Sequence, residues 1–335
     1  MPASRPSVRD VARLADVSVG TVSHVLNHPE RVATATRERV ESAIVELGFV
    51  RSQTARGLRA GSSFAVGVIV HDVSNPFYTE AARGIEDRLR EDGCVPMLCS
   101  SDADPGRELD VMRLLAGMDV RGVIITPAAS TVDNLGILSA RRIRVVLLDH
   151  PPVEGVSTVS GDDVAGARSA VAHLLDRGHR RIGFVNGPPI MRQSAERRQG
   201  VLAALGAAGL DQDDVLVEVE PVVGGKSFTA DAGAVGAARL LDSRPAPTAL
   251  FCANDQMAIG AMREIRRRGL GIPGDVAVVG YDDIPVASQL ITPLTSVNQQ
   301  MRQMGAAAAQ MLLSQEGDRH EVFAPALVVR ASTTA

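Results

Sequence analysis

The pattern of apolar positions divides the chain near residue 64. Before that point, apolar residues recur three or four positions apart, which is the spacing of one helical face. Three short helices are therefore predicted within residues 1–50. Ser7 and Ser18 stand where the first two would be N-capped, and the third runs from about Thr34 to a stop at Gly48. The predicted inward-facing residues are Val8, Val11, Leu14, Val22, Val25, Leu26, Val40, Ile44 and Leu47.

From Phe64 onward, apolar runs typical of strands alternate with helical stretches. Two successive series of this kind predict two α/β lobes with parallel sheets and right-handed crossovers. Ligands of such sheets bind beyond the carboxyl ends of the strands, so the cleft between the lobes is the expected site. The predicted strands are 64–70, 95–100, 122–126, 144–149, 181–186, 215–219, 248–253 and 276–280. The predicted helices are about 77–92, 106–117, 164–177, 194–209, 231–242 and 255–268.

Residues 8–27 carry the most specific local pattern, VRDVARLADVSVGTVSHVLN. Two short amphipathic helices meet at a tight turn, and the small polar residues Thr21 and Ser23 lie one turn into the second helix. This is the sequence form of a helix-turn-helix, whose second helix enters the major groove of DNA.

The polar stretch 51–63, RSQTARGLRAGSS, joins the two regions and contains one conspicuous apolar residue, Leu58. One interpretation is a flexible linker, and the other is a short hinge helix that folds only on DNA. Gly57 lowers the helix propensity of this segment by about 1 kcal/mol relative to alanine. That composition suits a segment that is disordered in the free protein.

The charge is divided unevenly along the chain, whose formal net charge is −4. Residues 1–60 hold nine arginines and six acidic residues, a net charge of +3, whereas the remainder carries −7. A basic head on an acidic body suits a protein whose small end touches phosphate.

Composition and motifs exclude several classes of protein. There is no apolar run of about 18 residues and no apolar N-terminal segment, so we expect a cytoplasmic protein without a membrane span. Cys94, Cys99 and Cys252 have no metal-ligand spacing and are interpreted as buried free thiols. Phosphate-loop, dinucleotide, nucleophile-elbow and zinc-protease motifs are missing. No catalytic residue, metal or cofactor is therefore predicted.

A series of short sequence motifs, spread over essentially the whole length, resembles the LacI/GalR (lactose-repressor) family of bacterial transcription regulators. Each is weak alone, but their order over an α/β background is highly specific. They are DVARLADVSVGTVSHVLN (10–27), TRERVESAIVELGF (36–49), SNPFY (74–78), RGVIITP (121–127), GHRRIGFV (178–185), Arg197–Gly200, FCANDQMAIGA (251–261), VAVVGYDDI (276–284) and LTSVNQ (294–299).

The resemblance implies an N-terminal all-α helix-turn-helix headpiece, joined by a hinge to an α/β core like a periplasmic binding protein, with two parallel-sheet lobes. The implied domains are 1–50, the hinge 51–63 and the core 64–335. The N-lobe would comprise about 64–161 plus 293–322, and the C-lobe about 162–292 plus 323–335. The implied function is a homodimeric repressor that binds a palindromic operator in double-stranded DNA. A small-molecule effector, such as a sugar or related metabolite, would switch it.

By the same resemblance, the DNA-binding residues fall into three groups. Val19, Gly20 and His24 occupy base-reading positions, and His24 stands where relatives usually have arginine. The alternative for His24 is a solvent-facing residue with a phosphate contact. The predicted phosphate contacts are Ser18, Thr21, Ser23, Asn27 and Thr36, with capping and turn chemistry as the alternative.

The third group lies in the hinge. Leu58 matches a leucine that wedges into the minor groove, and Ala55 suits close packing of two hinge helices. Arg51 and Ser52 replace the Pro-Asn that is common in relatives, so the resemblance does not fix the residue at which this helix begins.

The implied effector contacts are polar residues that follow apolar strands or begin helices. Strand-end carboxylates also cap helices, which remains the alternative for Asp255. Phe184 is interpreted as a core residue. The predicted effector-binding residues are Asp149, Arg197, Asn254, Asp282 and Gln299, with Phe77, Tyr78 and Phe228 as aromatic walls.

Three other functions compete with this interpretation. The two lobes alone would suit the binding protein of an importer, but residues 1–60 argue against it. The polar cleft residues could belong to an enzyme, in which case a bound ligand would be turned over. A DNA-binding protein without a working effector site is the third, and stabilisation by a ligand would argue against it.

Overall fold

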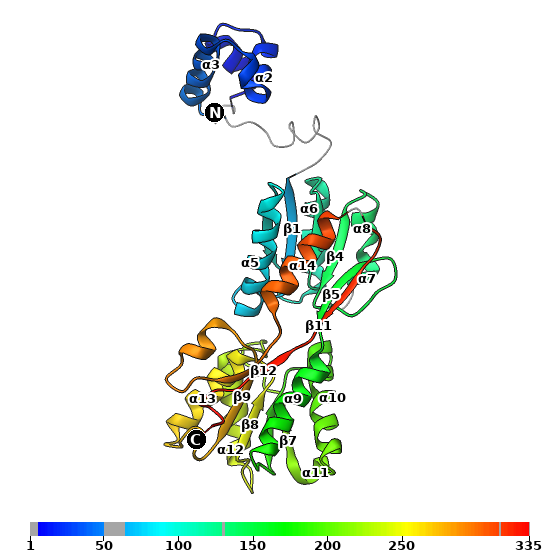
Figure 1. The fold of residues 1–335 in the computed structure, drawn as a ribbon, viewed down its shortest axis with the longest axis vertical. Coiled ribbons are helices and arrows are strands. Elements are labelled where there is room, and N and C mark those ends of the chain that lie inside the picture. The colour runs from blue at the N-terminus through cyan, green and yellow to red at the C-terminus, as the bar shows by residue number, and fades with distance from the viewer. Residues whose placement is uncertain (1–5, 50–63, 129–130, 315, 335) are drawn as a thin grey trace. The chain divides into compact units, whose positions relative to one another are not determined.

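The computed structural model describes residues 6–49, 64–128, 131–314 and 316–334. The chain forms two compact units, Met1–Phe64 and Ala65–Ala335, which Figure 1 shows as ribbons. The division falls where the hydrophobic pattern changes. The expected hinge residues Ala55 and Leu58 lie outside the described residues.

In the first unit, three helices pack around a small apolar core, as the sequence predicts. The Ser7 side chain caps the first helix in a capping box with Asp10, and Ser18 Oγ accepts a hydrogen bond from Thr21 N at 3.0 Å. Gly48 ends the third helix with a φ of 59°. The elements are α1 (Val8–Leu14), α2 (Val19–Asn27), the 3₁₀ turn η1 (Pro29–Arg31) and α3 (Thr34–Leu47).

One predicted core position in this unit is wrong. Leu14 is 43% exposed, because Val11 and Ala12 of α1 and its C-cap residue Ala15 are the buried ones instead. The two alanines are small, so α1 can pack closely against its neighbours. An apolar residue at the end of a seven-residue helix need not face the core.

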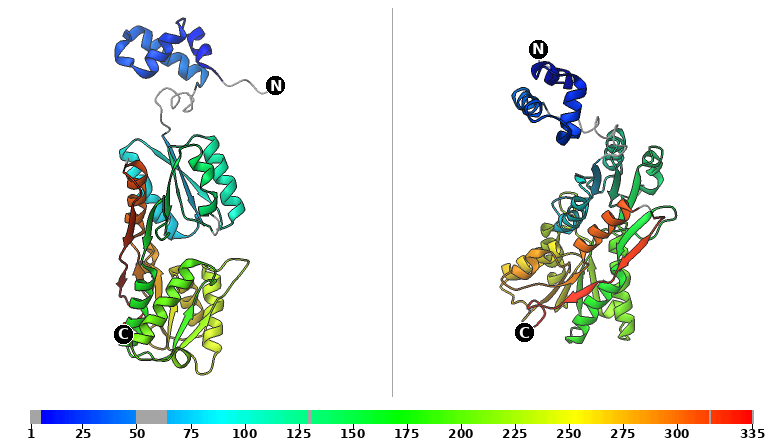
Figure 2. Two further views of the ribbon diagram at one scale, coloured as in Figure 1. Left: turned by 90° about the vertical axis from the view of Figure 1, so that its right-hand side faces the viewer. Right: turned by 45° about the horizontal axis from the view of Figure 1, so that its top comes forward.

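The second unit contains two α/β lobes, which confirms the predicted fold class. The N-lobe sheet has six parallel strands in the order β11-β5-β4-β3-β1-β2. Its helices cover both faces of the sheet (Figure 2). The strands are β1 (Ala65–Val70), β2 (Val95–Ser100), β3 (Gly122–Ile125), β4 (Arg144–Leu148), β5 (Ser157–Gly161) and β11 (His320–Phe323). The helices are α5 (Pro76–Glu91), α6 (Pro105–Gly117), α7 (Thr131–Asn134), α8 (Gly136–Ser139) and α14 (Met301–Leu313).

The C-lobe sheet also has six strands, in the order β12-β10-β9-β8-β6-β7, and only β12 runs antiparallel to its neighbour. The strands are β6 (Ile182–Val185), β7 (Leu216–Val219), β8 (Ala249–Cys252), β9 (Ala277–Asp282), β10 (Thr295–Asn298) and β12 (Ala326–Val328). The helices are α9 (Asp163–Asp176), α10 (Arg192–Ala207), α11 (Gln212–Val215), α12 (Ala230–Asp242), α13 (Asp255–Arg267) and the 3₁₀ turn η2 (Pro285–Gln289).

The chain passes between the lobes three times, after β5, after β10 and after β11. Figure 1 shows the last passage as the red strands β11 and β12, one in each lobe. The expected N-lobe segment 293–322 begins too early, because β10 pairs with β9 in the C-lobe sheet. The second passage therefore falls at Gln299 and Gln300.

Glycines allow the helices of each lobe to pack very closely. A Cβ added to Gly84 of α5 would lie 1.9 Å from the carbonyl oxygen of Arg302 in α14. A Cβ added to Gly260 of α13 would lie 1.7 Å from the carbonyl oxygen of Ala230 in α12. Both helix pairs approach backbone to backbone at these points. This close packing holds the two helices of each pair in a fixed position relative to each other.

Candidate functional site

The candidate DNA-reading surface lies on α2, the second helix of the helix-turn-helix. Val22 and Val25 point into the core, and Val19, Gly20 and His24 are exposed on the other side. A Cβ added to Gly20 would meet only Ser18 Oγ, at 3.4 Å. Packing within the headpiece therefore does not require glycine at position 20.

The polar residues of α2 also bond to one another. Ser18 Oγ lies 2.9 Å from Thr21 Oγ1, and Asn27 Nδ2 donates to the carbonyl oxygen of Ser23 at 2.7 Å. Ser18 therefore caps α2, which is the alternative that the sequence offers to a phosphate contact. Thr36 lies in the first turn of α3 and is half-buried.

A second candidate site is a cluster of polar side chains that links the two lobes. Its members follow strands or begin helices, as predicted. Asp149 comes directly after β4, Asp282 ends β9, and Gln299 follows β10. Asp149 and Asp282 both have positive φ angles, 58° and 105°. Non-glycine residues rarely adopt such angles, and they concentrate at functional sites.

Asp149 of the N-lobe is held by two residues of the C-lobe. Arg192 Nη2 donates to Asp149 Oδ1 and to its carbonyl oxygen, both at 2.8 Å. Gln193 Nε2 donates to Asp149 Oδ2 at 2.7 Å. Arg192 and Gln193 carry no sequence signal for this role, because polar residues at the start of a helix usually face solvent.

Arg197 is almost fully buried at the centre of the cluster. Its Nε donates to Asp163 Oδ1 at 2.8 Å, and its Nη1 donates to the carbonyl oxygen of Ala253. The guanidinium also lies 3.9 Å from the centre of the Tyr281 ring, a cation–π geometry. Asp163, which is also buried, was not predicted as a site residue.

Asp282 and Gln299 are bonded to each other. Gln299 Nε2 donates to Asp282 Oδ1 at 2.8 Å, and Arg197 Nη2 lies 4.0 Å from the same oxygen. The structure thus brings together four predicted residues, Asp149, Arg197, Asp282 and Gln299. Asp163 and Arg192 connect them into one network.

Burial sets the charge state of this network. Burial raises the pKa of Asp282 to about 7, although Arg197 and the Gln299 hydrogen bond oppose the shift. Burial likewise raises the pKa of Asp163 and of Glu196, against the arginines beside them. Burial disfavours the charged form of Arg197, but Asp163 and neighbouring groups outweigh it and raise the pKa of that guanidinium. Burial likewise opposes the charge of Arg192, but Asp149, Asp163 and Glu196 outweigh it and raise the pKa of that guanidinium, so Arg192 and Arg197 both stay charged.

Aromatic residues lie on both sides of the cluster. Phe77 and Tyr78, at the start of α5, are buried with ring centres 4.9 Å apart. His71 Nε2 lies 3.0 Å from the carbonyl oxygen of Pro127, so that nitrogen carries the proton. His71 Nδ1 then accepts from the Tyr78 hydroxyl, 3.1 Å away. In the C-lobe, the ring of half-buried Phe228 lies beside Gly187 and Ser194.

Asn254 has a structural role in addition to any contact with a ligand. Its Oδ1 accepts from Met257 N at 2.9 Å, which caps α13, and its Nδ2 donates to the carbonyl oxygen of Phe228. Asp255 is not the cap: it accepts hydrogen bonds from Ile284 N and Ser296 Oγ. Phe184 lies in the core, stacked on Phe251, as predicted.

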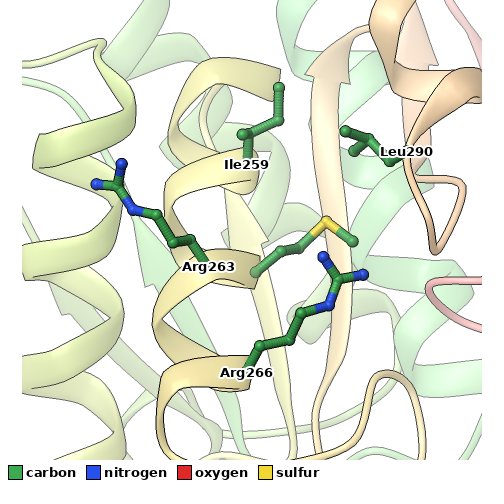
Figure 3. Close-up of a pocket in the computed structure, with 5 residues that line it drawn as sticks. Ile259, Arg263, Arg266 and Leu290 are labelled. Carbon is green, nitrogen blue, oxygen red and sulfur yellow. The ribbon is translucent and has the colours of Figure 1, made fainter.

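A separate hollow of about 230 Å³ lies on the outer side of α13. Figure 3 shows Ile259, Arg263 and Arg266 on the helix, with Leu290 on the adjacent segment. It shares no lining residue with the interlobe cluster.

Within the described ranges, no three His, Cys, Asp or Glu side chains are grouped to hold a metal ion. No helix in these ranges is long and apolar enough to cross a membrane.

Two family profiles match the chain. Residues 7–52 match the profile described as bacterial regulatory proteins, lacI family. Residues 171–333 match a periplasmic binding protein-like domain. Together they cover the two kinds of domain predicted from the sequence.

Whole-length relatives are transcription regulators. The chain is 37% identical to the HTH-type transcriptional regulator CelR of Thermobifida fusca over 92% of its own length and 91% of that protein. It is 31% identical to the HTH-type transcriptional repressor PurR of Aliivibrio salmonicida, over 94% of its length and 93% of the relative.

Two solved structures of transcription regulators align with nearly the full length of this chain. A CelR–cellobiose complex is 34% identical, with a TM-score of 0.71 over 98% of this chain and 100% of the other. The lac repressor dimer bound to operator and the anti-inducer ONPF is 27% identical, with a TM-score of 0.81 over 99% and 100%.

Proposed function

Because this chain belongs to the LacI family of bacterial transcription regulators, we propose that it is a homodimeric repressor of a palindromic operator. Its known relatives are regulators and not enzymes. A small-molecule effector, such as a sugar or related metabolite, would bind between the lobes and switch DNA binding. The protein would act in the cytoplasm, where the DNA is.

The interlobe cluster carries the effector part of this proposal. Asp149, Arg197, Asp282 and Gln299 would contact the effector, between walls formed by Phe77, Tyr78 and Phe228. Two relatives were solved with sugars, one with cellobiose and one from Enterococcus faecium with ribose. Asn254 would contribute only with the part of its side chain that capping leaves free.

Contacts between the lobes supply a route for switching. Arg192 and Gln193 reach Asp149, and Lys226 Nζ lies 3.1 Å from Asp72 Oδ2 in the other lobe. An effector that replaces one of these contacts would favour a different angle between the lobes. It can shift that equilibrium only by its differential affinity for the two states.

The DNA-binding part rests on the exposed face of α2. Val19 would pack on a thymine methyl group, Gly20 would permit close approach, and His24 would read one base edge. Phosphates would be bound by Ser18, Thr21, Ser23, Asn27 and Thr36. Ala55 and Leu58 are proposed for the hinge, with Leu58 as the minor-groove wedge.

An unpartnered sheet edge supports the homodimer. In the described part of the chain β2 is an edge strand, and its Val95 and Leu98 are exposed. Leu114 of α6, the next helix in the chain, and its C-cap residue Met118 are exposed as well. Exposed apolar edge strands usually pair or are covered, so a second copy would bury this surface.

The decisive experiment is selection of bound duplexes from a random DNA library at one near-physiological salt concentration. We expect a palindrome with a flexible central step to be enriched. Salt-sensitive binding without enrichment would contradict sequence-specific binding by the free protein. The selected duplex then serves to screen effectors for release or strengthening of binding.

A further inference from the structure

The second helix of the helix-turn-helix, α2, contains no arginine, lysine, aspartate or glutamate. Its sequence is VGTVSHVLN, and His24 is its one ionisable residue. His28 follows as the C-cap residue, one helical turn further along, with the two ring centres 6.5 Å apart. Both histidines are exposed. Because imidazole changes its charge between pH 5 and pH 8, the charge on this surface depends on pH.

The rest of the headpiece does not supply a surplus of positive charge. Residues 6–49 hold five arginines, six carboxylate side chains and no lysine, so their net charge is −1 while both histidines are neutral. The basic surplus of residues 1–60 comes from arginines outside this range, which are Arg5, Arg51, Arg56 and Arg59. Protonation of His24 and His28 changes the net charge of residues 6–49 to +1. Two protons therefore reverse the sign of the charge on this unit.

Few charged groups of the headpiece lie close to these two rings. The helices α1 and α3 and the turn η1 pack against α2. Within residues 6–49, Glu30 is the one carboxylate in an ion pair with a histidine, since its Oε1 lies 3.7 Å from His28 Nδ1. The same oxygen lies 3.6 Å from Arg31 Nε. The other ionisable residues on these elements, and in the turn before α2, are Arg9, Asp10, Arg13, Asp16, Arg37, Glu38, Arg39, Glu41 and Glu46.

Bound DNA would bring a dense row of negative charge to this surface. A negative charge nearby favours the protonated form of histidine. A protonated ring also offers two donors to phosphates or base edges, where the neutral ring offers one. The complex would therefore hold more protons than the free protein and free DNA together. Affinity must then increase as the pH falls, because the state that binds more protons is favoured at low pH.

We propose that DNA binding is coupled to proton uptake by His24 and His28, so that acidification strengthens repression. This inference rests on the DNA-binding function proposed above and adds a regulatory input that is separate from the effector. Four histidines take part in a dimer. Each proton taken up changes the affinity by about tenfold per pH unit.

The test compares the affinity of the full-length protein for the duplex obtained by library selection at pH 6 and at pH 8. No effector is added, and both measurements use one ionic strength, because salt alone changes DNA affinity. We expect binding to be at least tenfold tighter at pH 6. Calorimetry near pH 7, in buffers with different protonation enthalpies, should show uptake of at least one proton per bound dimer. Equal affinity at the two pH values, or no proton uptake, would overturn the proposal.

The double variant His24→Gln/His28→Gln tests the assignment to these two residues. Glutamine is polar but does not titrate, and both positions are exposed, so the headpiece should fold. The affinity of this variant should be nearly the same at pH 6 and at pH 8. A pH dependence as steep as that of the native protein would assign the protons to other groups and overturn the proposal. The matched control is His320→Gln, at an exposed histidine of the core, which should keep the full pH dependence.

A duplex of mixed sequence separates this proposal from the proposed function. Binding to both duplexes with equal affinity, but more tightly at pH 6, would refute sequence-specific repression and leave the proton coupling standing. Sequence-specific binding with no pH dependence would do the reverse. Absence of binding to either duplex at both pH values would refute the DNA-binding function and the proton coupling together.

Discussion

At the scale of single residues, His24 is the position on α2 where a substitution should change sequence preference. Imidazole has fewer donors than guanidinium, and only the latter binds guanine with two parallel hydrogen bonds. We predict that His24→Arg introduces a preference for guanine at one position of each half-site, worth about 1–3 kcal/mol against other bases. Repeating the library selection measures it.

The control for this substitution is His28→Arg. His28 is also exposed but lies just after the end of α2, so it adds the same charge outside the predicted reading face. It should strengthen binding to all sequences alike. A new guanine preference in the His28 variant, or none in the His24 variant, would contradict the assignment.

Asp282 should make effector binding depend on pH. Burial, opposed by Arg197, raises its pKa to about 7. Without effector, its neutral form stabilises the core fully below the ordinary value near 4, and this contribution is lost as pH rises through 7. A hydroxyl that donates to the carboxylate favours the ionised form. We therefore predict tighter effector binding at pH 8 than at pH 6, by up to about tenfold per pH unit below 7.

Calorimetry in buffers with different protonation enthalpies measures this effect, because binding near pH 7 should release protons. Asp282→Asn should remove the release. Proton uptake on binding, or pH-independent affinity in the native protein, would show that the effector does not stabilise ionised Asp282.

Some of the site could be predicted at residue scale, and some could not. Asp149, Asp282 and Gln299 follow strands, and parallel sheets bring strand ends together, so their meeting is predictable. Asp163, Arg192 and Gln193 are polar residues at helix starts, where exposure is the usual outcome. Arg192 and Gln193 are half-buried because they reach Asp149 in the other lobe, and Asp163 is buried against the arginines of α10. Local sequence does not encode such contacts.

At the scale of elements, close packing of α12 against α13 depends on Gly260. We predict that Gly260→Ala destabilises the protein by about 1–3 kcal/mol, because the new methyl group would collide with the backbone of Ala230. Gly206→Ala in α10 is the control, since a Cβ there meets nothing within 4 Å. It should stabilise by up to about 1 kcal/mol through helix propensity. Thermal unfolding should show a lower melting temperature for Gly260→Ala and a higher one for Gly206→Ala. Equal shifts of the two melting temperatures would contradict the packing argument.

The elements also show which sequence signals suffice. Ser7, Ser18 and Gly48 mark helix ends through side-chain chemistry that acts locally, and these ends were predicted. The strands β5 and β10 were missed, because STVSG and TSVN contain few apolar residues although they are almost wholly buried. In β10, Thr295 and Ser296 are bonded to Ser332 and Asp255, far away in the chain. The pattern of apolar positions does not report polar groups whose partners are distant.

At the scale of the whole molecule, the two edges of the N-lobe sheet should behave differently. Val95 on β2 is 61% exposed and Val322 on β11 is 57% exposed, so neither glutamate substitution should unfold the monomer. β2 is followed in the chain by α6, whose Leu114 and whose C-cap residue Met118 are also exposed apolar residues. If a second copy covers this surface, Val95→Glu should place two buried like charges near each other in a symmetric interface.

We therefore predict that Val95→Glu raises the dimer dissociation constant at least 100-fold, while Val322→Glu leaves it unchanged. Sedimentation at several protein concentrations measures both. Operator affinity of the Val95 variant should fall at low concentration and recover as the protein is concentrated, because a monomer holds only one half-site. A dimer that persists in the Val95 variant but is lost in the Val322 variant would move the interface to the opposite edge of the sheet.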